Sequence, residues 1–189
     1  MAIQTNGFLS GYLRSKRLGA VLPYVKSGRI LDWGCGVGAL GVHVDASRYV
    51  GVDIDDVSLN IAKSRFPDHR FVYPDDPLLN SENTFDAVVA LALIEHVENP
   101  ETWLAEIKKH LAPNGSLVLT TPHPSMQWAH ELGARVGLFS AEAAEDHNVL
   151  VDLPAMETLS QKVDLSIALY RRFLMRCNQL FVLTHPHRA

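Results

Sequence analysis

The hydrophobic residues of the chain follow two spacings in turn, one typical of amphipathic helices and one typical of buried strands. Helical spacing occurs over residues 8–25, after Asp55 or Asp56, after Asn99 and over residues 154–162. Between these segments lie short apolar runs at residues 29–32, 49–53, 71–73, 85–91 and 116–121. Strands that alternate with helices pair in parallel, so the pattern predicts an α/β fold with a doubly wound, mostly parallel sheet.

Local signals predict where these helices begin and end. Pro23 disturbs the last turn of the helix over 8–25, and Ser27-Gly28 ends it. A short helix is expected from about Ala39. The helix after Asn99 has a capping residue in Asn99 and a proline at its first position, with Trp103, Ile107 and Leu111 on one face. Asn114-Gly115 is expected to turn into the strand over 116–121.

The end of the chain has a different pattern. Two β-rich runs, residues 163–173 and 179–185, are separated by too few residues for a helical crossover. They should therefore pair as an antiparallel hairpin. Because no linker or repeat interrupts the chain, the sequence predicts one domain over 1–189, with 1–27 as a leading helical segment and the mixed stretch 122–153 as a substrate lid.

Composition narrows the class of protein. The 189 residues are 47% hydrophobic and 20% charged, which is typical of a globular protein. Seventeen Lys and Arg residues against 21 Asp and Glu residues give a net charge of −4. This balance disfavours nucleic acids, anionic membranes and polyanionic substrates as partners.

Cysteine usage and the apolar runs predict a compartment. Cys35 and Cys177 form no Cys-x-x-Cys pair, and no cluster has the spacing of zinc ligands, so a metal site is not expected. Two thiols in a chain of this size favour a reduced, cytoplasmic protein. The apolar runs are too short to span a bilayer, and residues 1–10 do not resemble a secretory signal.

The candidate chemistry lies at a glycine-rich loop. Asp32 ends the first predicted strand, Gly34, Gly36 and Gly38 follow it, and Asp53 ends the second. Ligands of open α/β sheets bind at the carboxyl ends of the strands, and an acid about 20 residues after the first glycine can accept hydrogen bonds from ribose hydroxyls. Taken alone, the glycines are more simply interpreted as a tight turn, and Asp53 as an acidic residue at the start of a helix. In this order together they favour a nucleoside-binding site.

The nucleoside is indicated by Asp32. Gly34-x-Gly36-x-x-Ala39 also fits the fingerprint of a dinucleotide-binding loop, so a nicotinamide-dependent oxidoreductase is the first alternative. A carboxylate two residues before the first glycine would repel a pyrophosphate but would favour an ammonium group. S-adenosylmethionine carries ribose, an amino-acid ammonium and a sulfonium but no phosphate, so it fits the loop better.

With these residues in view, the sequence resembles the class I S-adenosylmethionine-dependent methyltransferases, in particular the small-molecule branch that includes types 11 and 12. Four segments carry the resemblance in the family's order: 30–38, 50–54, 85–90 with 94–100, and 111–117. The resemblance implies a Rossmann-like sheet of seven strands that ends in an antiparallel hairpin. It also implies an enzyme that moves a methyl group to a small-molecule acceptor.

The resemblance further implies roles for single residues. Gly34, Cys35, Gly36 and Gly38 would hold the methionine part of the cofactor, with Asp32 near its amino group. Asp53 would bind the ribose and Ile54 would lie against adenine. Asp75 or Asp76 would lie near the adenine edge, the choice between them staying open, and Leu91 and Ala92 would line the cofactor.

Residues for catalysis and acceptor binding are less evident, because methyl transfer mainly requires alignment and the exclusion of water. A general base is needed for some acceptors, and His96 and His123 are the candidates. Tyr12, Trp128, His130 and His147 are candidates for acceptor binding. Arg14, Lys16 and Arg17 lie on the leading helix, where a charged face is usually solvated. A second alternative is a non-catalytic S-adenosylmethionine-binding module that acts with a partner.

Overall fold

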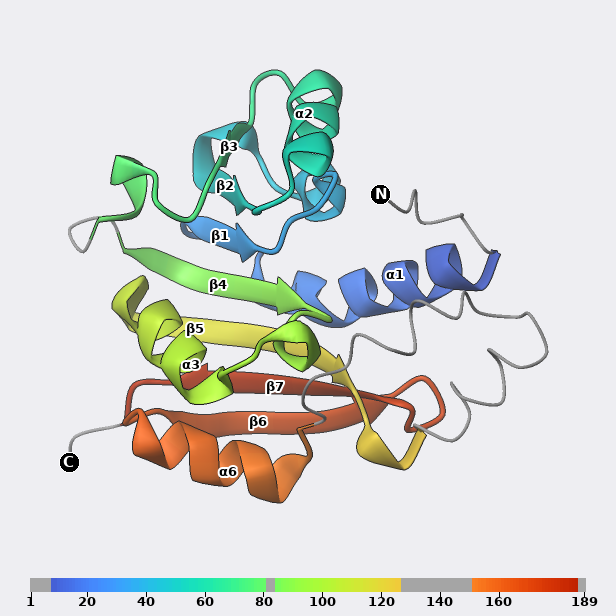
Figure 1. Cartoon of the computed structure of the whole chain (residues 1–189), viewed down its shortest axis with the longest axis vertical. Coiled ribbons are helices and arrows are strands. Elements are labelled where there is room, and N and C mark those ends of the chain that lie inside the picture. The colour runs from blue at the N-terminus through green and yellow to red at the C-terminus, as the bar shows by residue number, and fades with distance from the viewer. Residues whose placement is uncertain (1–7, 81–83, 127–150, 187–189) are drawn as a thin grey trace.

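The fold is described from a computed structural model, in which residues 8–80, 84–126 and 151–186 are described. Its centre is a seven-stranded sheet with the order β3-β2-β1-β4-β5-β7-β6 (Figure 1). The strands are β1 (Ile30–Trp33), β2 (Tyr49–Val52), β3 (Arg70–Val72), β4 (Phe85–Leu91), β5 (Leu111–Pro122), β6 (Ser166–Phe173) and β7 (Asn178–Thr184).

Strand direction confirms the predicted fold class. β1 pairs in parallel with β2 and β4, β2 with β3, and β4 with β5. β7 is antiparallel to both β5 and β6, as the short connection between the last two strands predicts. The carboxyl ends of β1 to β5 therefore share one edge of the sheet, and β6, which runs parallel to β5, ends at the same edge.

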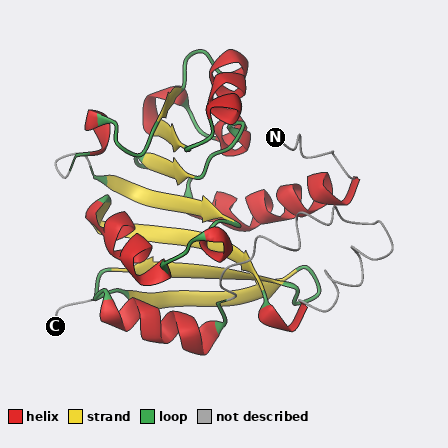
Figure 2. Cartoon of the chain, viewed as in Figure 1, coloured by secondary structure: helices red, strands yellow, loops and turns green. Residues whose placement is uncertain are grey.

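Helices cover both faces of the sheet (Figure 2). The α-helices are α1 (Phe8–Val21), α2 (Asp56–Arg65), α3 (Pro100–Lys109) and α6 (Leu153–Lys162). Short 3₁₀ helices connect the other elements: η1 (Leu22–Tyr24), η2 (Ala39–His43), η3 (Ala46–Arg48), η4 (Pro77–Leu79), η5 (Ile94–His96) and η6 (Pro124–Met126). α1, η2 and α2 pack on one face, while α3 and α6 pack on the other.

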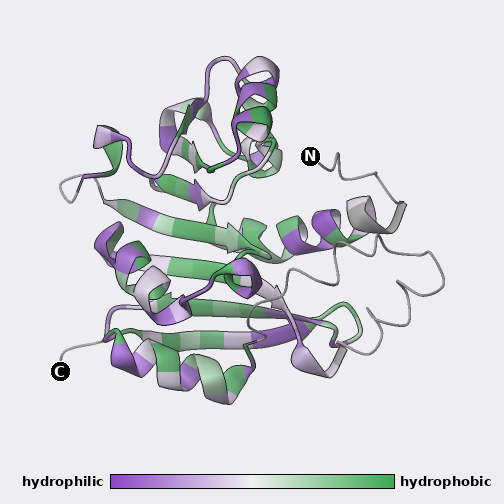
Figure 3. Cartoon of the chain, viewed as in Figure 1, coloured by the Kyte–Doolittle hydropathy of each residue, from purple (hydrophilic) through white to green (hydrophobic). Residues whose placement is uncertain are grey.

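The central strands are hydrophobic on both sides, because both faces of the sheet are covered (Figure 3). On β5, Leu117 and Leu119 belong to the core under α3 and α6, and Val118 belongs to the core under α1 and α2. β4 is similarly buried apart from Asp86, which is exposed, and Leu91 at its half-buried end. This explains why the sequence of β4 shows an almost continuous apolar run rather than an alternation.

Side-chain caps fix the helix starts. Asp55, rather than Asp56, caps α2 by accepting a hydrogen bond from the Ser58 N–H at 2.9 Å. Asn99 caps α3 through the Thr102 N–H at 3.0 Å, as predicted. Both caps lie in the connections that follow β2 and β4, and they satisfy backbone N–H groups in the first turn of each helix.

Some predicted boundaries are wrong for local reasons. Leu111 is not on the face of α3 but begins β5, opposite Phe85, and 114–115 forms an irregularity inside β5 instead of a turn before it. The helix expected from Ala39 is only a 3₁₀ segment, and β6 begins at Ser166 rather than at residue 163. At Pro23 the leading helix changes to η1, as the proline predicts.

Candidate functional site

The glycine-rich loop folds back against the end of β2. The N–H groups of Gly34 and Cys35 both donate to the carbonyl oxygen of Val52, at 2.8 and 2.9 Å. Gly34, Gly36 and Gly38 have φ angles of 79°, 52° and 75°, a region that favours glycine. The loop therefore depends on glycine for its path and holds that path through backbone hydrogen bonds.

Asp53 joins this loop to the end of β2. Its Oδ2 accepts a hydrogen bond from the Gly36 N–H at 2.7 Å, and its Oδ1 accepts one from the Asp55 N–H at 3.0 Å. A Cβ atom added at Gly36 would meet nothing within 4 Å, so the backbone at this point faces open space. Asp53 is half-buried, and each of its oxygens has a further lone pair for a ligand hydroxyl. A carboxylate and an open stretch of backbone thus lie side by side.

Asp32 lies under the loop rather than on its surface. It is 2% exposed, and its Oδ2 accepts a hydrogen bond from the Tyr49 hydroxyl at 2.7 Å. Burial raises the pKa of Asp32 to about 7, the Tyr49 hydrogen bond opposes this rise, and the nearby charge of Asp53 adds to it. A cation bound above the loop would favour the ionised form of Asp32.

Cys35 is a packing residue of this loop. Its side chain is 6% exposed, and burial, followed by the charges of Asp32 and Asp53, raises the pKa of the thiol far above its usual range. The thiol therefore stays protonated. A Cβ atom at Gly51 on β2 would approach Cys35 Sγ to 2.9 Å and Phe71 to 2.6 Å, so the loop packs closely over a strand position that has no side chain.

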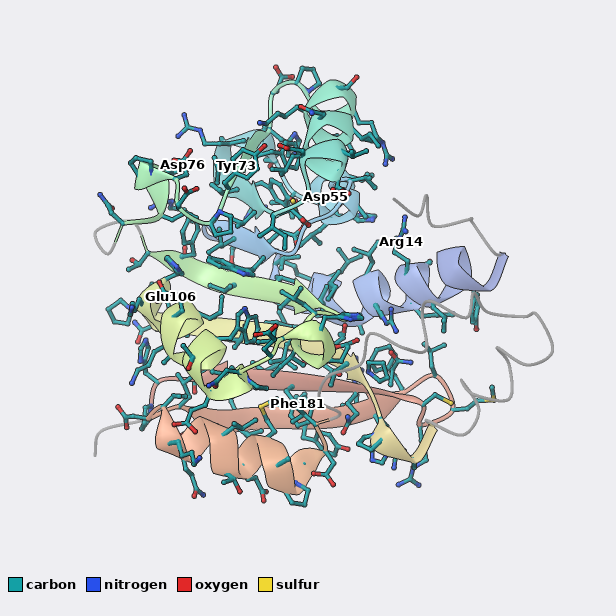
Figure 4. All side chains as sticks on the ribbon, viewed as in Figure 1. Arg14, Asp55, Tyr73, Asp76, Glu106 and Phe181 are labelled. Carbon is teal, nitrogen blue, oxygen red and sulfur yellow. The ribbon has the colours of Figure 1, made fainter. Side chains whose placement is uncertain are left out.

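The residues predicted to meet adenine differ in exposure. Ile54, directly after Asp53, is 83% exposed, which is unusual for a large apolar side chain. Asp76 caps η4 by accepting a hydrogen bond from the Leu78 N–H at 2.8 Å, whereas Asp75 is exposed. Figure 4 shows Asp76 on the loop after β3 and Asp55 at the start of α2.

The end of β4 closes the other side of the loop. Leu91 and Ala92 are half-buried, and the Ala92 N–H donates to the Thr120 carbonyl oxygen at 2.8 Å. Ala92 has a φ of 52°, so the chain turns sharply there. A Cβ at Gly34 would meet the Leu93 side chain at 3.0 Å, which places the turn against the glycine loop.

The pair Glu95-His96 in η5 is divided between the interior and the surface. His96 is exposed, whereas Glu95 is 1% exposed and its Oε2 accepts a hydrogen bond from the Thr121 hydroxyl at 3.0 Å. Burial raises the pKa of Glu95, and the charge of Arg17 is among the groups that oppose this. The sequence drew attention to the histidine and missed Glu95. The sequence carried no clear signal for Glu95, because its partner Thr121 lies on another strand, 26 positions further along the chain.

His123 follows β5 and is held by its neighbours. Its backbone N–H donates to the Cys177 carbonyl oxygen at 2.8 Å, and its Nδ1 accepts a hydrogen bond from the Ser125 N–H at 3.1 Å. Burial lowers the pKa of His123, and the charge of Arg172 lowers it further. The neutral ring therefore carries its hydrogen on Nε2 and presents a donor there.

The leading helix brings further candidates to this edge. Tyr12 is 50% exposed with Lys16 over its ring, and Arg14 projects from α1 into solvent (Figure 4). Arg17 does not share that exposure: it is half-buried, so the expectation of a wholly solvated charged face is wrong at this position. Trp128, His130 and His147 lie outside the described residues.

The structure therefore brings together the glycine loop, Asp32, Asp53, Ile54 and the end of β4. No group of three or more His, Cys, Asp or Glu side chains suited to a metal ion occurs within residues 8–80, 84–126 and 151–186. Over the same residues no helix is both long and apolar enough to cross a membrane. The arrangement suits a ligand with a ribose, a flat apolar ring and a cationic group.

Comparison with known families and sequences gives consistent matches. A family model described as a methyltransferase domain matches residues 6–169. Ubiquinone biosynthesis O-methyltransferase of Rickettsia conorii is 32% identical over 98 residues, which cover 49% of this chain and 34% of that protein. Pavine N-methyltransferase of Thalictrum flavum is 31% identical over 104 residues, covering 49% of this chain and 29% of that protein. The chain thus spans about a third of the length of these two relatives.

Solved structures share the fold. Magnesium protoporphyrin IX methyltransferase of Synechocystis, solved with bound SAH, has a TM-score of 0.73 at 15% identity, and the match covers 98% of this chain and 90% of the Synechocystis chain. A putative methyltransferase in complex with the Trm112 activator of Haloferax volcanii has a TM-score of 0.72 at 16% identity, covering 94% of this chain and 90% of its own.

Proposed function

The chain belongs to the family of methyltransferase domains, and we propose that it transfers a methyl group from S-adenosylmethionine to a small-molecule acceptor. Family membership agrees with the resemblance read from the four sequence segments, and S-adenosylmethionine is the methyl donor that this membership supports. The observation that carries the proposal is the pairing of the Asp53 carboxylate with the Gly36 N–H beside open backbone.

Each part of the loop has a proposed role in holding the donor. Gly34 and Gly36 would lie along its methionine part, and Asp53 would accept hydrogen bonds from the ribose hydroxyls. Ile54, which is exposed, would cover adenine, and desolvation of that side chain would favour binding. Asp32 would act on the donor's ammonium group from below the loop, through charge rather than direct exposure.

Methyl transfer from a sulfonium requires few catalytic side chains. When bound, S-adenosylmethionine would supply a methyl group on a sulfonium: the carbon–sulfur bond would break as a bond formed between the acceptor and the methyl carbon, and a neutral thioether would leave. The chain's own task is to align the acceptor, exclude water and, for an acidic acceptor group, receive its proton. His96 and His123 remain the proposed candidates for that last task. His123 could take the proton only after its Ser125 hydrogen bond rearranged, since Nδ1 is the nitrogen that carries the lone pair.

We further propose that residues 1–189 form one domain with an acceptor-binding cap over 122–153, in a protein of the cytoplasm. Residues 127–150 of this cap, with Trp128, His130 and His147, lie outside the described part of the chain. Cys35 and Cys177 are both free thiols, in keeping with a reducing compartment. An acceptor of modest size would suit so short a cap.

Calorimetric titration tests the proposal against both alternatives. We expect S-adenosylmethionine and S-adenosylhomocysteine to bind and NAD not to bind. NAD binding without S-adenosylmethionine binding would instead support an oxidoreductase. Turnover of the methyl donor with a library of hydroxylated and amine metabolites, with product masses measured, then separates an enzyme from a binding module: an increase of 14 Da identifies the acceptor.

A further inference from the structure

Four polar side chains form two hydrogen-bonded pairs at the carboxyl edge of the sheet, although the partners are far apart in sequence. They come from α1, η5, β5 and β7, and they are Arg17, Glu95, Thr121 and Asn178. Glu95, Thr121 and Asn178 are buried, with exposed fractions of 1%, 0% and 4%. Buried polar groups are almost always hydrogen-bonded, so the bonds that these side chains make show which elements they connect.

Two hydrogen bonds connect these elements. Arg17 Nε donates to Asn178 Oδ1 at 3.0 Å, and the Thr121 hydroxyl donates to Glu95 Oε2 at 3.0 Å. Asn178 and Thr121 are neighbours in the sheet, because the β5–β7 register pairs Asn178 with Pro122 and Gln179 with Thr121. Side chains alternate along a strand, so Thr121 shares the face of Leu119 and Asn178 the face of Leu180. The two bonds therefore lie on opposite faces at the same edge of the sheet, where one holds α1 to β7 and the other holds the turn after β4 to β5.

Charge strengthens this connection. Burial lowers the pKa of Arg17, and the charge of Glu95 opposes that fall. Burial likewise raises the pKa of Glu95, and the charge of Arg17 opposes that rise. Each group thus favours the charged form of the other, and removing one alone would leave the other desolvated without that opposite charge.

The position of α1 gives the cluster a consequence for the site. Val21 at the carboxyl end of α1 packs in the core, while the first turns of the helix extend past the end of β4 (Figure 1). Arg17 lies between these two parts, so its hydrogen bond to Asn178 on β7 fixes how α1 lies on the edge of the sheet. Glu95 belongs to the same turn as Leu91 and Ala92, the proposed lining of the cofactor.

We propose that Arg17, Glu95, Thr121 and Asn178 form a latch that fixes α1 on the carboxyl edge of the sheet, and that Arg17 and Glu95 are positioning residues for the bound methyl donor. The second part of this proposal, the positioning of the methyl donor, rests on the proposed function. The two residues act through the placement of α1 and of the turn after β4, and neither needs to touch the donor.

A double-mutant cycle with hydrogen exchange tests the latch without requiring an acceptor. Arg17→Met keeps the apolar stem and removes the charge, and Glu95→Gln keeps an oxygen that can accept from Thr121. In each single variant we expect amide exchange in α1 to accelerate about tenfold, since a charge-assisted interaction is lost. Helix α6, on the opposite face, serves as an internal reference and should be unchanged. In the double variant neither charge is left alone, so α1 should regain part of its protection.

S-adenosylhomocysteine is the probe for the positioning role of Arg17 and Glu95 in donor binding. We expect its affinity to fall about tenfold in each single variant and to recover partly in the double variant, in parallel with the exchange of α1. Lys16→Gln and Glu98→Gln, which change exposed charges on the same helix and near the same turn, are the matched controls and should leave both readouts unchanged.

The outcomes separate the two halves and the proposed function. Unchanged exchange in α1, or a double variant that loses as much as both single variants together, would overturn the latch. Altered exchange with unaltered affinity would overturn the positioning role alone. If wild-type protein fails to bind S-adenosylhomocysteine, the proposed function fails while the exchange data still decide the latch. Asn178→Ala, which removes only the Arg17 acceptor, provides a second variant if Glu95→Gln unfolds.

Discussion

The two halves of the site are built in different ways. On the β1–β2 side, the glycine loop and Asp53 come from 22 consecutive residues, 32–53, and are joined mainly by backbone hydrogen bonds. On the β4–β5–β7 side, Arg17, Glu95, Thr121 and Asn178 are spread over the chain, and Arg17 and Asn178 alone are separated by 161 positions. The first half is thus encoded by a local motif, whereas the second exists only once the sheet has formed.

The largest effect should come from filling the space under the glycine loop. Gly51→Ala puts a Cβ within 2.6 Å of Phe71 and 2.9 Å of Cys35 Sγ, and both are buried. We expect a loss of about 3 kcal/mol in the free energy of unfolding, because overpacking in a core forces neighbours to move. Chemical denaturation measures this loss.

Gly19→Ala is the matched control for that substitution. A Cβ at Gly19 on α1 meets nothing within 4 Å, so this change should stabilise the protein by up to about 1 kcal/mol through helix propensity. Equal effects of the two substitutions would show that the loop does not pack as tightly as described.

Removing the carboxylate of the local motif should mainly affect binding. We expect Asp53→Ala to weaken S-adenosylhomocysteine binding by about 2–3 kcal/mol, since hydrogen bonds to a charged group are lost and the Gly36 N–H loses its partner. Isothermal titration calorimetry gives the value. Asp68→Ala, at an exposed position just before β3 and away from the carboxyl edge, should change affinity much less, and an unchanged affinity in Asp53→Ala would place the ribose elsewhere.

The raised pKa of Asp32 allows the role of the glycine-loop half of the site to be tested by varying pH. Its pKa of about 7 is raised above the unfolded value, so its contribution to the stability of the free protein is present at low pH and lost as pH rises from about 4 through 7. Binding of a ligand ammonium group should have the opposite dependence, because it favours the ionised carboxylate. We expect affinity for S-adenosylhomocysteine to increase about tenfold between pH 6 and pH 8. Asp32→Asn should remove most of this increase, and a variant that keeps it whole would exclude Asp32 as its source.

The sequence contains signals for the local half of the candidate site but none for the distributed half. Asp32, Gly34 and Asp53 could be recognised because strand, loop and acid follow one another directly. Glu95 could not, because its partners Thr121 and Arg17 are identified only by the β5–β7 register and the packing of α1. The same reason explains the boundary errors: Leu111 fits the helical spacing of α3, and only pairing with Phe85 makes it a strand residue. Asp53 itself was predicted as a ligand residue, but its bond to Gly36 needed the structure.

The smallest effect concerns a buried polar group that neither half of the site uses. His110 at the end of α3 is 4% exposed, and within the described residues neither of its ring nitrogens has a hydrogen-bond partner. Glu106 Oε1 lies 3.9 Å from Nε2, and the Trp33 ring lies 5.2 Å from the imidazole centroid. Burial lowers the pKa of His110, so the folded protein binds fewer protons there than the unfolded chain, and stability falls as pH drops below about 6.5.

His110→Phe should therefore stabilise the protein by about 1 kcal/mol at neutral pH and by more at pH 5.5, as measured by denaturation at both values. S-adenosylhomocysteine affinity should stay at the wild-type value. A stabilisation independent of pH would mean that His110 is not forced to remain neutral, and a change in affinity would mean that the polar groups of this face are coupled to the site after all.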